Sequence, residues 1–204
     1  MNQNTKIHSF LLEKSKFISL LHKEIKFNGE LKIPIRSEDL FFFLTKTIIS
    51  QQISDKAANS IWDKFRKQIS SKVLNIFVIK NENELIQYLS NAGVSKRKIL
   101  YILGVFEHIV TKKLTLEKLN TKCTQELRNN LNEIKGIGNW TIDMLLIFFL
   151  HQKNVFPEND LIIKKVKNKI IFTHDQKLNL RKIFSPYLSF LSLHFWKMAK
   201  RVLN

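Results

Sequence analysis

Apolar residues recur at intervals of three and four along most of the chain, the spacing that places side chains on one face of an α-helix. This pattern predicts helices over residues 40–48, 57–65, 84–91, 99–109, 124–133 and 140–150, and helix within 180–203, where Pro186 is expected near the start of the final helix. Ser54 is the expected N-cap of the second helix, because its hydroxyl can accept a hydrogen bond from a backbone amide. The chain has only 5 Gly and 3 Pro, and neither alternating nor Gly-bounded strand patterns recur. We therefore expect an all-α protein.

Positive charge is the second feature of the sequence. The 204 residues include 34 Lys and Arg against 17 Asp and Glu, giving a formal net charge of +17 with 44% hydrophobic and 11% aromatic residues. This composition predicts a folded protein with a real core rather than a disordered basic tail. A positive field attracts polyanions, so nucleic acid is the expected partner and an anionic membrane surface is the alternative.

Cysteine usage and the length of the apolar runs exclude several classes of protein. With Cys123 as its one cysteine, the chain can form no internal disulfide and cannot supply four thiolates to a zinc or iron–sulfur site. The six histidines have no metal-ligand spacing. The longest apolar run, Met144 to Leu150, is far shorter than the roughly 20 residues that cross a bilayer. We expect an intracellular protein, in the cytoplasm or nucleoid of a prokaryote and in the nucleus or an organelle otherwise.

Two glycines one residue apart, Gly136 and Gly138, separate two predicted helices. Glycine permits a tight turn and lets a backbone approach a phosphate closely. Amides at the start of the following helix can then point at that phosphate. This arrangement predicts a hairpin that grips a DNA backbone without reading its sequence, although a Gly-x-Gly alone is also common in ordinary turns. The expected DNA contacts in this segment are Lys135, Gly136, Ile137, Gly138 and Thr141.

Several segments, taken in order, resemble the helix–hairpin–helix DNA glycosylase superfamily, and within it the alkylated-base glycosylases of the 3-methyladenine DNA glycosylase II type. The matching segments are residues 48–54, 92–98, 131–143, 155–164 and 193–196. The resemblance covers roughly residue 40 to the end of the chain. It implies a two-lobed helical fold without the N-terminal β-lobe of fuller family members. The expected parts are an N-terminal segment, 1–39, that packs with the C-terminal lobe, a middle bundle, 40–135, and the hairpin with the C-terminal helices, 136–204.

The resemblance makes Asp160 the catalytic residue. Cleavage of an N-glycosidic bond builds positive charge on the deoxyribose, which a carboxylate can stabilise while it also orients the attacking water. Without the resemblance, an aspartate after Pro157 is more simply a helix N-cap, and the two roles are compatible. Bifunctional relatives place a nucleophilic lysine where this sequence has Trp140. The resemblance therefore implies a monofunctional hydrolase that leaves an abasic site.

Other residues are assigned by the resemblance to the damaged base and to the duplex. Trp140 and Trp196 match aromatic walls of a base pocket, where an indole face attracts a cationic purine. Met144 lies one turn beyond Trp140, and core packing is the alternative for all three residues. Gln51 and Gln52 match the segment that fills the gap left by an extruded nucleotide, with solvated surface as the alternative. The sequence does not decide which glutamine enters the duplex.

Together these features predict a monomeric base-excision repair enzyme that releases alkylated purines from damaged double-stranded DNA. The alternatives are a uracil or thymine-mismatch glycosylase, a catalytically silent DNA-binding protein and the membrane binder. No cofactor is expected, apart from a monovalent cation that the hairpin carbonyls could hold, as family hairpins often do. The run Lys96–Lys98 is interpreted as a solvated helix start, with phosphate contact as the alternative.

Overall fold

The computed structural model describes residues 2–35, 38–69, 75–121, 124–173 and 178–203, so Cys123 lies outside the described residues. The described residues form twelve α-helices and one short 3-10 helix and contain no β-strand. The all-α prediction is therefore confirmed. The chain divides into two compact units, a terminal unit of residues 1–35 and 146–204 and a middle unit of residues 36–145.

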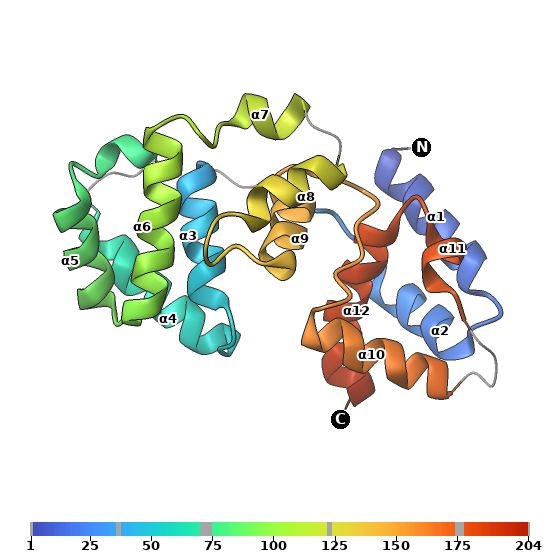
Figure 1. The fold of residues 1–204 in the computed structure, drawn as a ribbon. Helices are drawn as coiled ribbons and strands as arrows, with labels where there is room; N and C mark the ends of the chain where they lie inside the picture. Colours follow the sequence, from blue (N-terminus) through green and yellow to red (C-terminus); the bar gives the residue numbers. More distant parts are fainter. Residues whose placement is uncertain (1, 36–37, 70–74, 122–123, 174–177, 204) are drawn as a thin grey trace. The chain divides into compact units, whose positions relative to one another are not determined.

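A bundle of short helices makes up the middle unit (Figure 1). Its elements are α3 (Leu40–Ser50), α4 (Asp55–Gln68), η1 (Ile76–Val78), α5 (Glu82–Ala92), α6 (Lys96–Val110), α7 (Leu116–Thr121), α8 (Thr124–Asn132) and the first part of α9 (Asn139–Phe148). Helix α3 packs against both α4 and α6. Its residues Phe41, Phe42 and Leu44 are fully buried, so α3 is the centre of this core.

Several helix ends in the middle unit have capping residues. The Ser54 hydroxyl accepts a hydrogen bond from the Ala57 amide at 3.3 Å, which confirms Ser54 as the N-cap of α4. Gly93 follows α5 with a φ of 88°, a left-handed conformation that suits glycine after a helix. Asp39 caps α3 by accepting from the Phe42 amide at 3.0 Å.

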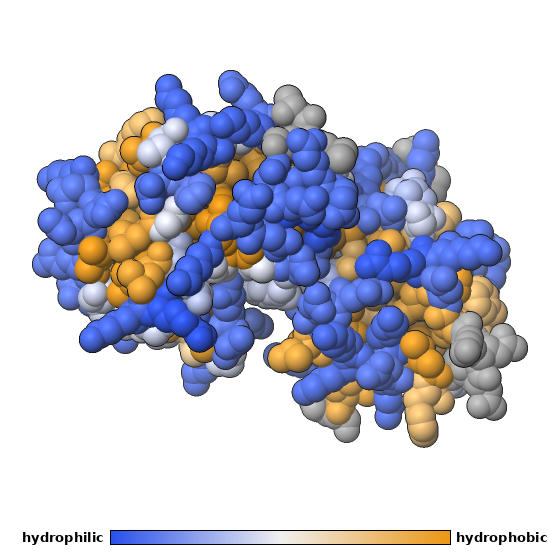
Figure 2. Space-filling model, in the orientation of Figure 1, coloured by the Kyte–Doolittle hydropathy of each residue, from blue (hydrophilic) through white to orange (hydrophobic). Residues whose placement is uncertain are grey.

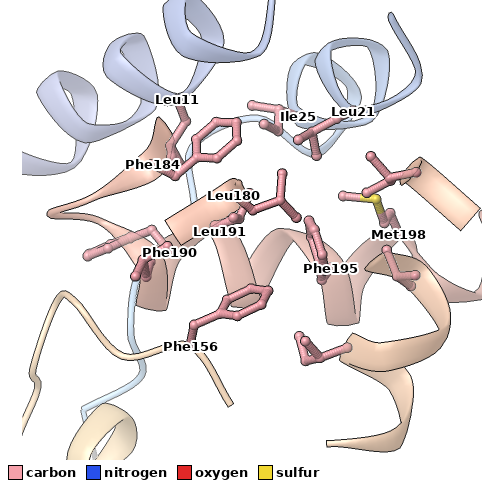
Figure 3. Close-up of a cluster of buried hydrophobic side chains, with 14 of the residues drawn as sticks. Leu11, Leu21, Ile25, Phe156, Leu180, Phe184, Phe190, Leu191, Phe195 and Met198 are labelled. Carbon is pink, nitrogen blue, oxygen red and sulfur yellow. The ribbon is translucent and has the colours of Figure 1, made fainter. Parts of the chain in front are cut away.

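The terminal unit joins the two ends of the chain around one hydrophobic core. Its elements are α1 (Gln3–Ser15), α2 (Ser19–Asn28), α10 (Leu161–Phe172), α11 (Leu180–Phe184), α12 (Leu188–Leu203) and the end of α9. Figure 3 shows Leu11 and Ile25 from the N-terminal helices together with Phe184, Phe195 and Met198 from the C-terminal ones. These five side chains are at most 1% exposed, so the N-terminal helices complete this core.

The stretch 180–203 contains α11 and α12, and Pro186 lies just before the final helix, as the sequence predicted, because it has no amide to donate and disfavours helix at Ser185. The division between the two units lies within α9, after Leu145. The hairpin therefore belongs to the middle unit, where its side-chain contacts lie. Figure 2 shows hydrophilic residues over much of the visible surface, as the lysine-rich composition requires.

A polar cluster of three buried residues, Glu24, Asn28 and His194, and the more exposed Arg201 connects α2 and α12 in the terminal unit. Arg201 Nη2 donates to Glu24 Oε2 and to Asn28 Oδ1, each at 2.6 Å. The Asn28 side-chain amide in turn lies 3.2 Å from Nδ1 of His194. His194 is only 1% exposed. Burial, with smaller contributions from His8 and Lys197, lowers the pKa of His194 to about 3. His194 is therefore neutral in the folded protein near neutral pH.

The low pKa of His194 predicts that mild acid destabilises the fold. In the unfolded chain a histidine titrates near pH ~6.5, so between that pH and about 3 only the unfolded state binds this proton. The free energy of unfolding should fall by up to about 1.4 kcal/mol for each pH unit in this window. His194→Gln removes the titration and should flatten the pH dependence of urea unfolding.

The matched control is His151→Asn, which removes an exposed histidine with a left-handed φ of 52°, a conformation that asparagine tolerates. This variant should keep the wild-type pH dependence. If His194→Gln also keeps it, another group dominates acid destabilisation.

Candidate functional site

Residues 133–138 form the hairpin between α8 and α9, and its two glycines have different surroundings. Gly136 has a φ of 93°, and a Cβ built there would overlap the ring of Tyr101 on α6. The missing side chain lets the hairpin backbone lie directly on that ring. No atom lies within 4 Å of a Cβ built on exposed Gly138. Gly136 therefore lets the hairpin pack against α6, whereas the backbone at Gly138 remains open to a ligand.

A nearly buried ion pair joins the two helices of the hairpin. Arg128 Nη2 on α8 donates to Asp143 Oδ1 on α9 at 2.5 Å, and the Asp143 side chain is only 7% exposed. The helical bonding of α9 begins with the Ile142 amide, which donates to the Gly138 carbonyl at 3.0 Å. Amides ahead of that point are outside the helical ladder, as in the first turn of any helix. The turn thus supplies fixed amides at the positive end of a helix dipole, which favours an anion.

The remaining hairpin residues that the sequence analysis assigned to DNA divide into two groups. Lys135 is exposed, so its ammonium group is available to an anionic partner. Ile137 is 3% exposed and Thr141 is 1% exposed. The side chains of these two residues support the hairpin from inside, and only their backbone groups remain for contact with a phosphate.

The two glutamines after α3 also have different roles. Gln51 Nε2 donates to the Gly136 carbonyl and to the Thr141 hydroxyl, both at 2.9 Å. This side chain ties the turn after α3 to the hairpin. Gln52 is exposed and has a left-handed φ of 57°. The turn therefore directs Gln51 inward and presents Gln52 to solvent.

Asp160 lies at the N-terminus of α10 in the terminal unit. Its Oδ1 accepts a hydrogen bond from the Ile163 amide at 2.9 Å, which confirms the predicted N-cap. The side chain is buried, with 8% of the residue exposed. Capping fixes the direction of the carboxylate, because one oxygen is held by the helix backbone.

The loop that leads to Asp160 is held by Ser189, a residue that the sequence analysis did not single out. Ser189 Oγ donates to the Gln152 carbonyl at 2.6 Å and accepts from the Val155 amide at 3.0 Å. Ser189 is fully buried near the start of α12. A serine within a helical apolar pattern carries no signal of such a role. The bonds of Ser189 fix the path of the chain shortly before the carboxylate.

The three residues predicted to line a base pocket lie on two helices, Trp140 and Met144 on α9 and Trp196 on α12. Trp196 belongs to the terminal unit, where its ring lies 5.6 Å from that of Phe148 at an interplanar angle of 33°. Trp140 is the second residue of α9 in the middle unit and is half-buried. Met144, further along α9, is 8% exposed and contributes to the core of the same unit.

The described residues offer neither a metal-binding cluster nor a membrane-spanning helix. No group of three or more His, Cys, Asp or Glu residues in the described ranges is arranged to hold a metal ion. Among those same ranges, no helix has both the length and the apolar character needed to span a membrane.

The all-helical fold, the glycine hairpin and the capped aspartate define the helix–hairpin–helix class of DNA-repair proteins. The family model described as HhH-GPD superfamily base excision DNA repair protein matches residues 45–187. The chain belongs to this superfamily.

Relatives of known name are similar over most of the chain. DNA-3-methyladenine glycosylase 1 of Schizosaccharomyces pombe is 31% identical over 163 residues, covering 77% of this chain and 71% of the relative. DNA-3-methyladenine glycosylase of Saccharomyces cerevisiae is 27% identical over 229 residues, covering 93% and 77%. Among solved structures, the S. pombe 3-methyladenine DNA glycosylase in complex with abasic DNA matches with a TM-score of 0.75 at 26% identity. That match covers 96% of this chain and 97% of the other.

The different surroundings of the two hairpin glycines predict separable effects. Gly136→Ala should lower the melting temperature, because its Cβ overlaps Tyr101 and its φ of 93° strains any side chain, at a cost of about 1–3 kcal/mol. Gly138→Ala should leave the melting temperature unchanged but weaken binding to unrelated duplexes equally, since the backbone carries no base information. Thermal unfolding and fluorescence anisotropy measure the two effects. Wild-type DNA affinity in Gly138→Ala would exclude a close contact at this backbone.

Proposed function

We propose that this chain is a monofunctional DNA glycosylase that hydrolyses the N-glycosidic bond of alkylated purines in double-stranded DNA and leaves an abasic site. The observation that carries the proposal is Asp160, a buried carboxylate fixed at the start of α10. It lies within the matched range of the base-excision repair superfamily. The relatives named above as DNA-3-methyladenine glycosylases support alkylated purines as the substrate class.

Asp160 can promote hydrolysis by electrostatics and by orienting water. As the base departs, positive charge grows on the deoxyribose, and a carboxylate held at a fixed position stabilises that charge without reorganising. The same carboxylate can accept a proton from the attacking water. Its hydrogen bond from the Ile163 amide at 2.9 Å and the loop held by Ser189 limit its motion.

The chain has no amine at the position where bifunctional members of the superfamily carry their nucleophile. That position is Trp140, the second residue of α9. An indole cannot attack the sugar to form a Schiff base, the intermediate that leads to strand cleavage. Water is therefore the proposed nucleophile.

We assign the gap-filling role to Gln52 rather than to Gln51. The Gln51 amide is engaged by the Gly136 carbonyl and the Thr141 hydroxyl, whereas Gln52 is exposed on a left-handed turn. A side chain that enters the duplex offsets part of the few kcal/mol that base extrusion costs. The hairpin amides and Lys135 would hold the neighbouring phosphates. A monovalent cation at the hairpin carbonyls stays a prediction.

The assignment of Asp160 predicts a specific loss in Asp160→Asn. Asparagine is also a good N-cap, so the fold should persist. Base release from methylated DNA, followed by chromatography, should fall by at least about 10²-fold, while binding to undamaged duplex is retained or tighter. Borohydride should trap no covalent adduct with the wild-type protein.

Glu158→Gln is the matched control for Asp160→Asn. This variant also removes one negative charge, but from an exposed carboxylate two residues earlier in the chain, which pairs with Arg181 at 2.9 Å. The Glu158→Gln protein should retain activity. Near-normal turnover of Asp160→Asn would show that another residue is catalytic. Release of uracil or thymine instead of methylated purines would favour a deaminated-base glycosylase, and binding without any release would favour a silent DNA-binding protein.

A base-pocket role for Trp140 predicts discrimination between cationic and neutral lesions. Trp140→Ala should reduce excision of cationic 3-methyladenine more than that of neutral hypoxanthine. The attraction of a cation to an aromatic face is worth about 0.5–2 kcal/mol, or about 2–30-fold in rate. Trp140→Phe, which keeps a weaker aromatic face, should lose less. Equal losses for both bases would mean that Trp140 only supports the fold.

A further inference from the structure

The side chain of Lys98 is turned into the middle unit, unlike its neighbours at the start of α6. Lys96 and Arg97 are exposed, as a solvated helix start predicts. Lys98 Nζ instead donates to the Ile49 carbonyl at 2.7 Å and to the Gln51 carbonyl at 2.8 Å. The ammonium group therefore lies at the end of α3 and not in open solvent.

These two carbonyls need a partner, because α3 ends at Ser50 and carbonyls in the last turn of a helix have no amide ahead of them in the ladder. A cation at this end also interacts favourably with the helix dipole. Hydrogen bonds from a charged donor are stronger than neutral ones. Burial, and secondarily the nearby Arg97, lowers the pKa of Lys98. That direction is expected for an ammonium group withdrawn from water.

The Gln51 carbonyl belongs to the peptide group that joins Gln51 to Gln52, so its orientation sets the direction in which the Gln52 backbone leaves the turn. Gln52 is the next residue, with a left-handed φ of 57° that non-glycine residues adopt only when their surroundings hold them there. Lys98, Gln51 and Gln52 also line one open depression of about 270 Å³ beside the loop at Val94. Lys98 holds the carbonyl of Gln51 while the hairpin holds its side chain.

We propose that Lys98 is a positioning residue that locks the turn after α3, so that Gln52 is presented to the duplex in a fixed conformation. This proposal rests on the proposed function, because it acts through the gap-filling role of Gln52. Lys98 itself need not touch DNA, since its two hydrogen bonds go to backbone carbonyls.

The test that does not depend on activity is hydrogen exchange of the protein without DNA. Lys98→Met keeps the length of the side chain and removes the ammonium group. It should speed exchange in a peptide covering residues 49–55 relative to the wild type. Lys96→Met is the matched control, because it removes the same charge from an exposed lysine on the same helix turn. Unchanged exchange in Lys98→Met would overturn the positioning role.

The second test is a double-mutant cycle measured by single-turnover base release from methylated duplex. Lys98→Met should slow release by about tenfold, the order expected when a charge-assisted hydrogen bond is lost. Gln52→Ala should also slow release, and the double variant should be no slower than Gln52→Ala alone, because both changes affect one step. Lys96→Met should release bases at close to the wild-type rate.

The outcomes of the cycle separate this proposal from the proposed function. If the losses of Lys98→Met and Gln52→Ala multiply, Lys98 does not act through Gln52 and the positioning role is wrong. If the wild type releases no base at all, the proposed glycosylase function fails. The exchange experiment then still decides whether Lys98 locks the turn.

Discussion

The arrangement of the middle unit depends on the close contact between Gly136 and the ring of Tyr101. Only a residue without a Cβ permits this approach. The contact brings the Gly136 carbonyl to the Gln51 amide, 85 residues earlier in the chain. Lys98, one helical turn before Tyr101 on α6, binds the Gln51 carbonyl. Helix α6 therefore holds both the hairpin and the turn after α3, and Gln51 connects the two turns directly.

The terminal unit fixes Asp160 by a different means. Its carboxylate is held by backbone groups at the start of a helix, and the preceding loop is held by the buried hydroxyl of Ser189. Helices from both ends of the chain surround this region with a common hydrophobic core. A group that acts by electrostatic stabilisation must be in place before charge develops, and a rigid helix terminus meets that requirement. Loss of the N-terminal helices would therefore disturb Asp160 without any direct contact.

Local signals predicted much of this structure from the sequence. The helical period located α3, α5 and α6, and Ser54 and Asp160 cap helices as their residue types suggest. The predicted role of Asp160, by contrast, came from the resemblance and not from periodicity. Residues whose function depends on distant partners could not be predicted in this way. Gln51 and Gln52 are chemically identical, and only the hairpin contact separates them.

The formal net charge overstates the number of cations that are available to contact DNA phosphates. The ammonium of Lys98 is used by carbonyls of α3, Arg128 is paired with Asp143, and Arg201 is paired with Glu24. These three cations stabilise the fold, and their charges are engaged by carbonyls or carboxylates of the protein itself. The salt dependence of DNA binding should therefore reflect the number of phosphates actually contacted rather than the net charge of +17. The basic residues therefore have two tasks. Cations bound to carbonyls or carboxylates stabilise the fold, whereas exposed ones such as Lys135 supply the field that attracts a polyanion.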